Sequence, residues 1–412
     1  MLELDPPKSP SANTFATLVR TLRSQRDRAA KKQRFVNDSK QKFGIYFRPD
    51  ALPKACAVLV NHFSAFTTRS IFFLVDDYSS PKITDELQQN LNRLLMLRNS
   101  SCFFKLATES PASYENKDVD GKAYVEGREF KLVNVGMDFI NAEPTERLQF
   151  VDDVFNKRFR YTEDYPIKTL DVLLGDDPES RNSNEIARKL RDGKRWQVWG
   201  RHSLGEICSG DVHFLIELVG KMGTLHGGPA ALKTTGDNPV IPPETQNTAI
   251  RTEAGNFLRN LRSLPRGQEL VAIVEAFGSV AASYLRHKDS KNEEASPPHQ
   301  ASRIEPYDDP KLSPEAQDIY KDLLRYAVFI QDVRGKSRRG HVVPRLYLRR
   351  FLIPFFNLTF SKRDSLELNV EQLVELLLRP KDFETKMRLR GPAPDDGGRA
   401  PQLPFGPSGG PI

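Results

Sequence analysis

The chain has 412 residues, of which 38% are hydrophobic and 28% are charged, and this is enough for two or three domains with ordinary cores. No hydrophobic run approaches the length of a membrane span, and residues 1–10 are polar, which argues against a membrane protein or a secretory signal. Cysteines are few and scattered, at Cys56, Cys102 and Cys208, so we expect no disulfide framework and a cytoplasmic location. The net charge of +7 favours an acidic partner.

The N-terminal part, residues 1–42, is predicted to be a basic segment with disorder at its start. Residues 8–42 hold ten Lys or Arg against two acids, and the spacing of Phe15, Leu18 and Leu22 predicts a helix over residues 14–36. A short strand over 43–47 and a helix over 52–66 are expected next. The basic helix is either part of a nucleic-acid surface or, as we favour, a solvated helix.

Two hydrophobic strands follow, and they define the predicted fold class. Residues 71–75 are five consecutive apolar residues, which indicates a strand buried on both faces, and a second strand is expected over 102–108. Between them, leucines at helical spacing predict a helix that packs on the sheet. With a further strand expected over 129–135, this succession predicts an α/β fold with a parallel sheet covered by helices.

The second half of the chain is predicted to be helical up to residue 286 and to end in a small domain. Apolar stripes predict helices through residues 144–286, interrupted by a loop at 223–248. Residues 287–312 are charged and contain prolines, so we expect a linker there. A helix should begin at Ser313-Pro314, and another after Asn369, where Gln372 completes a capping-box pair. Residues 386–412 are predicted to be a disordered tail.

The strongest candidate for chemistry is the pair Asp76 and Asp77 at the end of the first strand. In parallel sheets the carboxyl ends of the strands carry the ligand site. One carboxylate there can hold Mg²⁺ through water and its neighbour can orient an attacking water. Thr108 ends the partner strand and is suited to contact a γ-phosphate. The alternative is two solvated acids that begin a turn.

A second candidate is the segment 209–213, which begins a predicted helix. Its early residues, Asp211 and His213, would face a nucleotide, helped by the helix N-terminus. The alternative, which the pattern alone favours, is an ordinary capped helix with an exposed histidine.

These segments together resemble the origin-recognition-complex-like, or initiator-clade, AAA+ ATPases, and in particular their bacterial members. Residues 71–78 resemble the Walker B strand, with Asp77 where many AAA+ proteins carry Glu, and residues 103–108 resemble the sensor-1 strand. Residues 208–219 resemble the sensor-2 lid helix. Three basic or apolar segments resemble the C-terminal region, which is a winged-helix DNA-binding domain in that clade: 335–340, 346–350 and 358–364. The resemblance covers residues 67–384.

The resemblance implies a role for each candidate residue and implies ATP and Mg²⁺ as cofactors. Asp76 would organise Mg²⁺, Asp77 would polarise water, and Thr108 would sense the γ-phosphate. Arg128 would be a finger that reaches a neighbouring subunit's nucleotide. Asp211 and His213 would contact the nucleotide, but His213 stands where the clade usually has Arg, and a neutral imidazole binds phosphate less strongly than a guanidinium.

The phosphate-binding loop of such ATPases has no counterpart in this sequence. No Gly-x-x-x-x-Gly-Lys-Ser/Thr occurs in the 412 residues. Gly335-Lys336-Ser337 lacks the upstream glycine, since position 330 is Ile, and we interpret it as a basic loop. Without backbone N–H groups and a lysine to hold the triphosphate, ATP binding loses its main anchors. The N-terminal part of the ATPase core therefore reads as incomplete.

The basic segment 334–350 is the candidate DNA-binding site. It has no acid, and two glycines allow a tight hairpin that would lie against phosphates as a wing. The alternative is a solvated basic face, or arginines that pair with acids on the ATPase part. The predicted DNA-binding residues are Arg334, Lys336, Arg338, Arg339, Arg345, Arg349 and Arg350.

We therefore expect a partial AAA+ α/β core over 43–143, a helical lid over 144–286 and a winged-helix-like domain over 313–385. The expected function is that of a DNA-associated AAA+ ATPase-like protein, an ATP hydrolase if active, with impaired ATP binding or hydrolysis. Its expected partners are DNA and either further copies of itself or a partner ATPase subunit. The alternative is a non-hydrolysing DNA-binding or scaffold module derived from an AAA+ ATPase.

Overall fold

The protein is described from a computed structural model, which covers residues 51–79, 83–96, 101–161, 167–177, 183–192, 194, 196–232, 239–286, 303–306, 312–338, 341–361 and 365–388. The helix expected over 14–36, the strand over 43–47 and the tail after residue 388 lie outside these residues. The chain divides into two compact units. Unit 1 holds the described residues up to Glu109 and Ser113–Leu132, and unit 2 holds Ser110–Ala112 and the described residues from Val133 onward.

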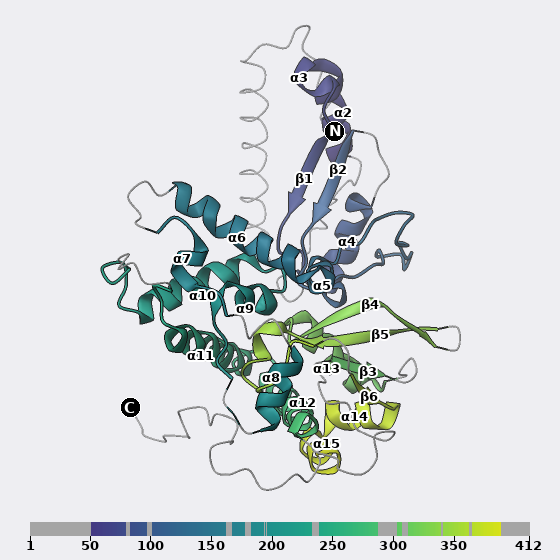
Figure 1. Ribbon diagram of the computed structural model, residues 1–412. Coiled ribbons are helices and arrows are strands. Elements are labelled where there is room, and N and C mark those ends of the chain that lie inside the picture. The colour runs from purple at the N-terminus through teal and green to yellow at the C-terminus, as the bar shows by residue number, and fades with distance from the viewer. Residues whose placement is uncertain are drawn as a thin grey trace, which may run out of the picture. The chain divides into compact units, whose positions relative to one another are not determined.

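Unit 1 is built on two parallel strands, β1 (Ile71–Val75) and β2 (Cys102–Leu106), which pair in register from Ile71 with Cys102 to Val75 with Leu106. The crossover between them contains α4 (Asp85–Leu95), which begins where the Thr84 side chain accepts the Leu87 N–H. The helices α2 (Ala51–His62) and α3 (Ser64–Thr67) precede β1, as Figure 1 shows. The predicted β-α-β arrangement is confirmed.

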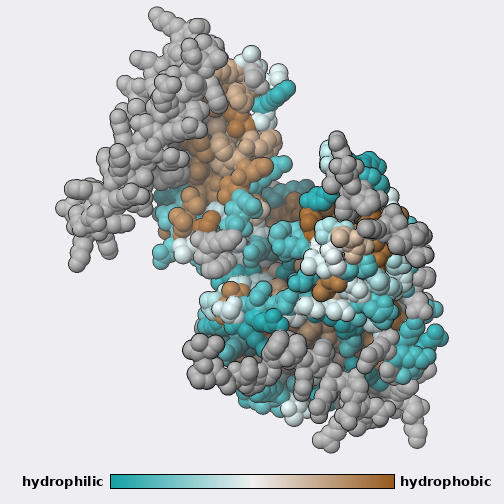
Figure 2. Space-filling view, turned by 90° about the vertical axis from the view of Figure 1, so that its left-hand side faces the viewer, coloured by the Kyte–Doolittle hydropathy of each residue, from teal (hydrophilic) through white to brown (hydrophobic). Residues whose placement is uncertain are grey.

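The strand pair buries one face better than the other. Cys102 is buried and its thiol hydrogen bonds with that of Cys56 on α2. On the other face, Phe72, Leu74 and Phe103 are 51%, 77% and 43% exposed. Figure 2 shows the hydrophobic side chains of this part of the chain at the surface. The prediction that β1 is buried on both faces is therefore wrong, because a run of apolar residues specifies a strand but not what covers it.

The strand predicted over 129–135 does not form. The described residues there contain only an isolated bridge between Glu126 and Phe130, and α5 (Val135–Asn141) begins at the end of the predicted strand. Asn134 explains the difference, since its side chain accepts the Met137 N–H and caps α5. A capping residue at this point stops an extended segment that hydrophobicity alone would continue.

Unit 2 is mainly helical, and its helices share one hydrophobic core with the C-terminal part of the chain. The described residues of the predicted lid and C-terminal domain are therefore one compact unit, which also contains residues 303–306 of the predicted linker. After α5, the helices up to residue 286 are α6 (Pro144–Tyr161), α7 (Leu170–Leu174), α8 (Ser183–Arg191), α9 (Gly200–Ile207), α10 (Val212–Leu225), α11 (Pro243–Arg262) and α12 (Gly267–Arg286).

The C-terminal part of unit 2 carries a sheet whose strand order is β4-β5-β3-β6. β4 (Phe329–Arg338) and β5 (His341–Leu348) form an antiparallel hairpin that projects from the unit in Figure 1. β3 (Arg303–Pro306) lies inside the predicted linker and pairs with both β5 and β6 (Leu366–Leu368). The prediction of a linker is therefore wrong for these four residues, which form a strand. The remaining elements are α13 (Pro314–Arg325), the 3-10 turn η4 (Arg350–Leu352), α14 (Val370–Leu378) and α15 (Pro380–Met387).

The predicted helix starts in this part of the chain are confirmed. The Ser313 side chain accepts the Ala316 N–H at the start of α13. At α14, Asn369 and Gln372 form the predicted capping box, in which each side chain bonds the other's backbone N–H. The described chain is a mixed α/β protein, and no helix within it is both long and hydrophobic enough to cross a bilayer.

Candidate functional site

The candidate site of unit 1 is a turn over residues 76–79, directly after β1, which carries Asp76 and Asp77 and which we call the acid turn. The backbone N–H of Asp77 donates to Asp76 Oδ1 at 2.9 Å. Asp77 has φ 54°, in the left-handed region that residues other than glycine seldom adopt, although Asp and Asn tolerate it best. Both carboxylates are exposed at the end of the strand. The chain thus accepts a strained backbone at the point where the sequence predicted chemistry.

The acid turn is held by its third residue, Tyr78. Tyr78 is fully buried, and its N–H donates to the Ala107 carbonyl oxygen at 2.9 Å, while the Ala107 N–H donates to the Val75 carbonyl oxygen at 2.8 Å. These two bonds extend the strand pair beyond β2. Because Thr108 directly follows Ala107, the acid turn and Thr108 emerge at the same edge of the sheet. The predicted group Asp76, Asp77 and Thr108 is therefore gathered at one edge of unit 1.

The chemistry that this edge can support is that of a hydrated divalent cation. Among the described residues, no group of three or more His, Cys, Asp or Glu is arranged to hold a metal ion. Two carboxylates fit Mg²⁺, which keeps several waters and binds through one or two carboxylates together with substrate phosphates. The residues present thus suit magnesium that arrives with a phosphate ligand, with Asp76 as the predicted contact.

Arg128 lies in the same unit, in a turn that follows Gly127 (φ 81°). Its side chain is 75% exposed, and its Nε lies 3.3 Å from Glu129 Oε1. The other Glu129 oxygen accepts the Val125 N–H at 3.0 Å and so closes the turn. The arginine predicted as a finger is thus on the surface and accessible to another molecule.

Asp211 and His213 belong to unit 2, at the start of α10. Asp211 caps this helix, since its Oδ1 accepts the Phe214 N–H at 2.9 Å, and its Oδ2 pairs with Arg349 Nη2 at 2.9 Å. The His213 side chain is 82% exposed and lies 3.2 Å from Glu217, one turn further along the helix. These contacts are those of the alternative reading, a capped helix with an exposed histidine, and they leave both Asp211 oxygens engaged within the protein.

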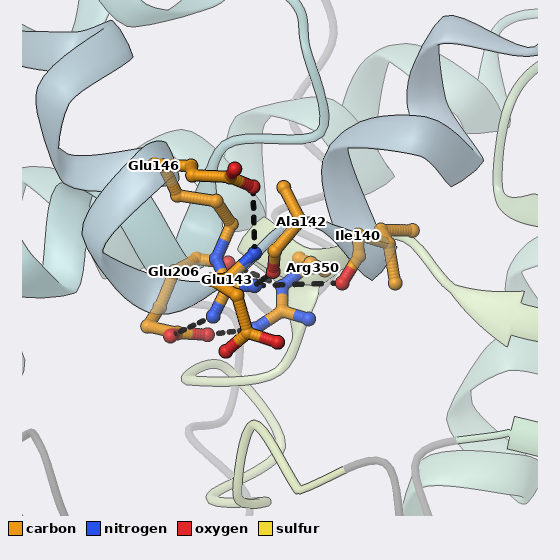
Figure 3. Close-up of polar contacts among 7 residues, drawn as sticks. Ile140, Ala142, Glu143, Glu146, Glu206 and Arg350 are labelled. Carbon is orange, nitrogen blue, oxygen red and sulfur yellow. Dashed lines mark hydrogen bonds and ion pairs between the residues drawn. The ribbon is translucent and has the colours of Figure 1, made fainter.

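Two of the predicted DNA-binding arginines are internal. Arg350 is only 3% exposed, and its guanidinium shares the Glu206 carboxylate with Arg147, as Figure 3 shows. Burial lowers the pKa of Arg350 to about 10, against the opposing effect of the Glu206 carboxylate. Arg349 pairs with Asp211 and lies over the ring of Phe351, with 4.8 Å between the guanidinium carbon and the ring centroid.

These contacts correct the DNA-binding assignment of three residues. Arg349 and Arg350 connect the base of the hairpin to α9 and α10, which is the alternative of arginines paired with acids. Arg345 likewise lies 3.3 Å from Glu305 on β3, whose carboxylate is buried. The Arg350 guanidinium is buried against a carboxylate and is therefore not available to a DNA phosphate. The side chains of Arg345 and Arg349 are 22% and 16% exposed and are paired with carboxylates of the protein, so we leave all three out of the proposed surface.

The outer part of the hairpin keeps the remaining basic residues. Arg334, Lys336 and Arg338 are on β4, where Lys336 pairs with Val343 and Arg338 with His341. The register shifts between Asp332 and Lys336, which indicates a bulge near Arg334. Arg339, in the two-residue connection to β5, lies outside the described residues. A basic β-ribbon is a geometry that known DNA-binding proteins place against a groove.

Buried polar residues that support these sites were not predicted from the sequence. Gln88 and Asn92 are fully buried on α4, four residues apart, on a helix predicted only from its leucines. Their i, i+4 spacing within an amphipathic helix was the available signal. For Glu206 no signal existed, because nothing local marks one glutamate as the partner of two arginines that are 59 and 144 residues away.

Unit 1 thus has a parallel strand pair with two acids directly after its first strand. Comparison with protein families gives the particular relationship. Residues 2–198 match the family described as ORC-CDC6-like, which makes this part of the chain similar to AAA+ ATPases of that type. No curated protein and no solved structure matches the chain.

Proposed function

We propose that this protein is a DNA-associated AAA+ ATPase-like protein whose magnesium–nucleotide site is the acid turn of unit 1. The observation that carries the proposal is the acid turn itself, two exposed carboxylates fixed in a strained backbone beside Thr108. The match of residues 2–198 to the ORC-CDC6-like family supports it, because the match includes this whole edge of the sheet. The bacterial source expected from the resemblance stays a prediction.

The residues of the acid turn have distinct proposed roles. Bound Mg²⁺ would neutralise the charge that develops on the phosphates during transfer. Asp76 would hold the hydrated metal, Asp77 would orient the attacking water, and Thr108 would contact the γ-phosphate. Arg128, which is exposed in the same unit, would reach the nucleotide of a neighbouring copy or of a partner ATPase subunit. His213 would add little, because it is exposed and pairs with Glu217.

Nucleotide affinity is proposed to be weak. The sequence has no Walker A motif, so the backbone N–H groups and the lysine that usually hold the triphosphate are not supplied by such a loop. The proposal therefore includes impaired ATP binding or hydrolysis. A partner that contributes further phosphate contacts would raise the affinity.

DNA association is the second part of the proposal, and it rests on the basic hairpin of unit 2. The hairpin is joined through β3 to a sheet against which helices pack, and we propose that it acts as the wing of a winged-helix-like domain. The alternative function keeps only this part, as a non-hydrolysing DNA-binding or scaffold module. The two proposed functions differ in whether ATP is hydrolysed, and both predict DNA binding that weakens as the salt concentration rises.

Replacing Asp77 with Asn tests the proposed site. Asn also tolerates the left-handed conformation, so the turn should keep its shape while the charge is lost. We expect phosphate release from ATP to fall by about 100-fold or more, which is typical of losing a group that takes part in proton transfer, while ATP binding persists. The matched control is Asp85→Asn, an exposed Asp in the first turn of α4, which should leave the rate unchanged. Wild-type protein with no phosphate release above background would contradict the hydrolase and favour the non-hydrolysing module.

A further inference from the structure

Two fully buried side-chain amides on α4 connect parts of unit 1 that are distant in sequence. Gln88 and Asn92 are both 0% exposed and lie one helical turn apart. A buried amide costs free energy unless its donors and acceptors are paired. The hydrogen-bond partners of these two amides therefore identify the segments of the chain that the amides hold together.

One set of partners is the loop that follows β2, residues 113–124, which we call the pinned loop. Gln88 Nε2 donates to the Ser113 carbonyl oxygen at 3.0 Å, and Gln88 Oε1 accepts the Glu115 N–H at 2.8 Å. Asn92 Nδ2 donates to the carbonyl oxygens of Glu115 and Lys117, at 2.6 and 2.8 Å. Four hydrogen bonds from two side chains thus fix the backbone of the pinned loop to the helix.

The pinned loop is also rigid within itself. The buried carboxylate of Asp118 accepts the N–H groups of Asp120 and Lys122, each at 3.0 Å, and the Tyr124 hydroxyl donates to it at 3.3 Å. An antiparallel bridge between Lys117 and Ala123 closes the loop. A movement of the loop at one end would therefore be carried to the other.

The same two residues also contact the acid turn, Asn92 through its side chain and Gln88 through its backbone carbonyl oxygen. The Tyr78 hydroxyl, fully buried, lies 3.1 Å from Asn92 Oδ1 and 3.2 Å from the Gln88 carbonyl oxygen. Asn92 thus bonds the loop with its nitrogen and the tyrosine of the acid turn with its oxygen.

We propose that Gln88 and Asn92 are positioning residues that make the acid turn and the pinned loop a single mechanical body. A ligand that orders one of the two segments then orders the other, and this coupling is reciprocal. The identity of the ligand, Mg²⁺ with ATP, rests on the proposed function. The mechanical link rests on the hydrogen bonds and on a contact between the rings of Tyr78 and Tyr114, whose centroids lie 6.3 Å apart. The loop would report the occupancy of the site to whatever contacts its exposed residues.

Hydrogen exchange in the full-length protein tests the link without any ligand. Asn92→Ala should speed exchange of the amides in the pinned loop and also those of Tyr78 and Ser79 in the acid turn, each by about tenfold or more. The matched control is Asn90→Ala on the same helix. Asn90 is exposed and its Nδ2 donates to the Glu86 carbonyl oxygen within α4, so neither segment should change. Faster exchange that is confined to residues 113–124 would overturn the proposal.

A second variant covers the case in which Asn92→Ala fails to fold. Tyr78→Phe keeps the buried ring and its contact with Tyr114 but removes the hydroxyl, so the loop stays bonded to α4 while the hydrogen bond from Tyr78 to Asn92 is lost. Addition of Mg²⁺ and ATP should slow exchange in both segments of the wild type, and in Tyr78→Phe the loop should respond less than in the wild type. An equal response of the loop in both proteins would overturn the proposal. A wild type that shows no response in either segment would contradict the proposed function, and the ligand-free comparison would still decide the link.

Discussion

Replacing Glu206 with alanine is expected to destabilise unit 2 by about 3–5 kcal/mol, the cost typical of breaking a buried ion pair on one side. The Glu206 carboxylate is shared by Arg147 and Arg350, whose side chains are each only 4% exposed. Its removal leaves two buried guanidinium groups without their counter-charge. A guanidinium keeps its proton in proteins, so Arg350 cannot escape the penalty by losing its charge.

Chemical denaturation followed by circular dichroism would measure this loss. The matched control is Glu275→Ala, which breaks an exposed pair between Glu275 and Arg262 at 2.9 Å and should cost about 0–1 kcal/mol. Equal effects of the two substitutions would show that Arg147 and Arg350 find other partners. The expected large effect would confirm that the hairpin base is fixed to α6 and α9 by charge as well as by packing.

Replacing both Lys336 and Arg338 with alanine is expected to weaken binding to duplex DNA by about tenfold or more near 0.1 M salt. If each contacts one phosphate, the slope of log affinity against log salt should become shallower by about 2. The weakening should be similar for unrelated sequences, because phosphate contacts carry no sequence information. Mobility-shift or fluorescence-anisotropy titrations over a range of salt concentrations would measure both quantities.

The control for the DNA experiment is the double substitution Arg259→Ala with Arg262→Ala. It removes the same charge from exposed positions on α11, a helix that is about seventy residues earlier in the sequence and is not part of the hairpin. If both double variants lose the same affinity, DNA would be bound by overall charge and the hairpin would have no special role. Absence of duplex binding at low salt would contradict DNA association altogether.

The sequence predicted those parts of the fold whose signals are local. The apolar runs specified β1 and β2, the leucine spacing specified α4, and the pairs Asn369–Gln372 and Ser313–Pro314 marked helix starts. Burial was not predictable in the same way, because whether Phe72 and Leu74 are covered depends on segments elsewhere in the chain. The strand expected over 129–135 failed because Asn134 caps a helix there.

The same difference between local and long-range signals applies to the candidate sites. Asp76, Asp77 and Thr108 could be predicted to lie together because parallel strands bring their carboxyl ends to one edge. The roles of Arg349 and Arg350 were not predictable, because a run of basic residues does not show which members meet an acid in the fold. Their partners Asp211 and Glu206 lie more than a hundred residues earlier, and only the folded chain brings them together.

We propose above that the acid turn binds magnesium together with a nucleotide. Isothermal titration calorimetry of the full-length protein with ATP, with and without Mg²⁺, tests it most directly. We expect weak ATP binding that requires Mg²⁺, is lost in Asp76→Ala and persists in Asp77→Asn. Absence of binding at millimolar ATP, or binding that is indifferent to both Mg²⁺ and Asp76, would contradict it.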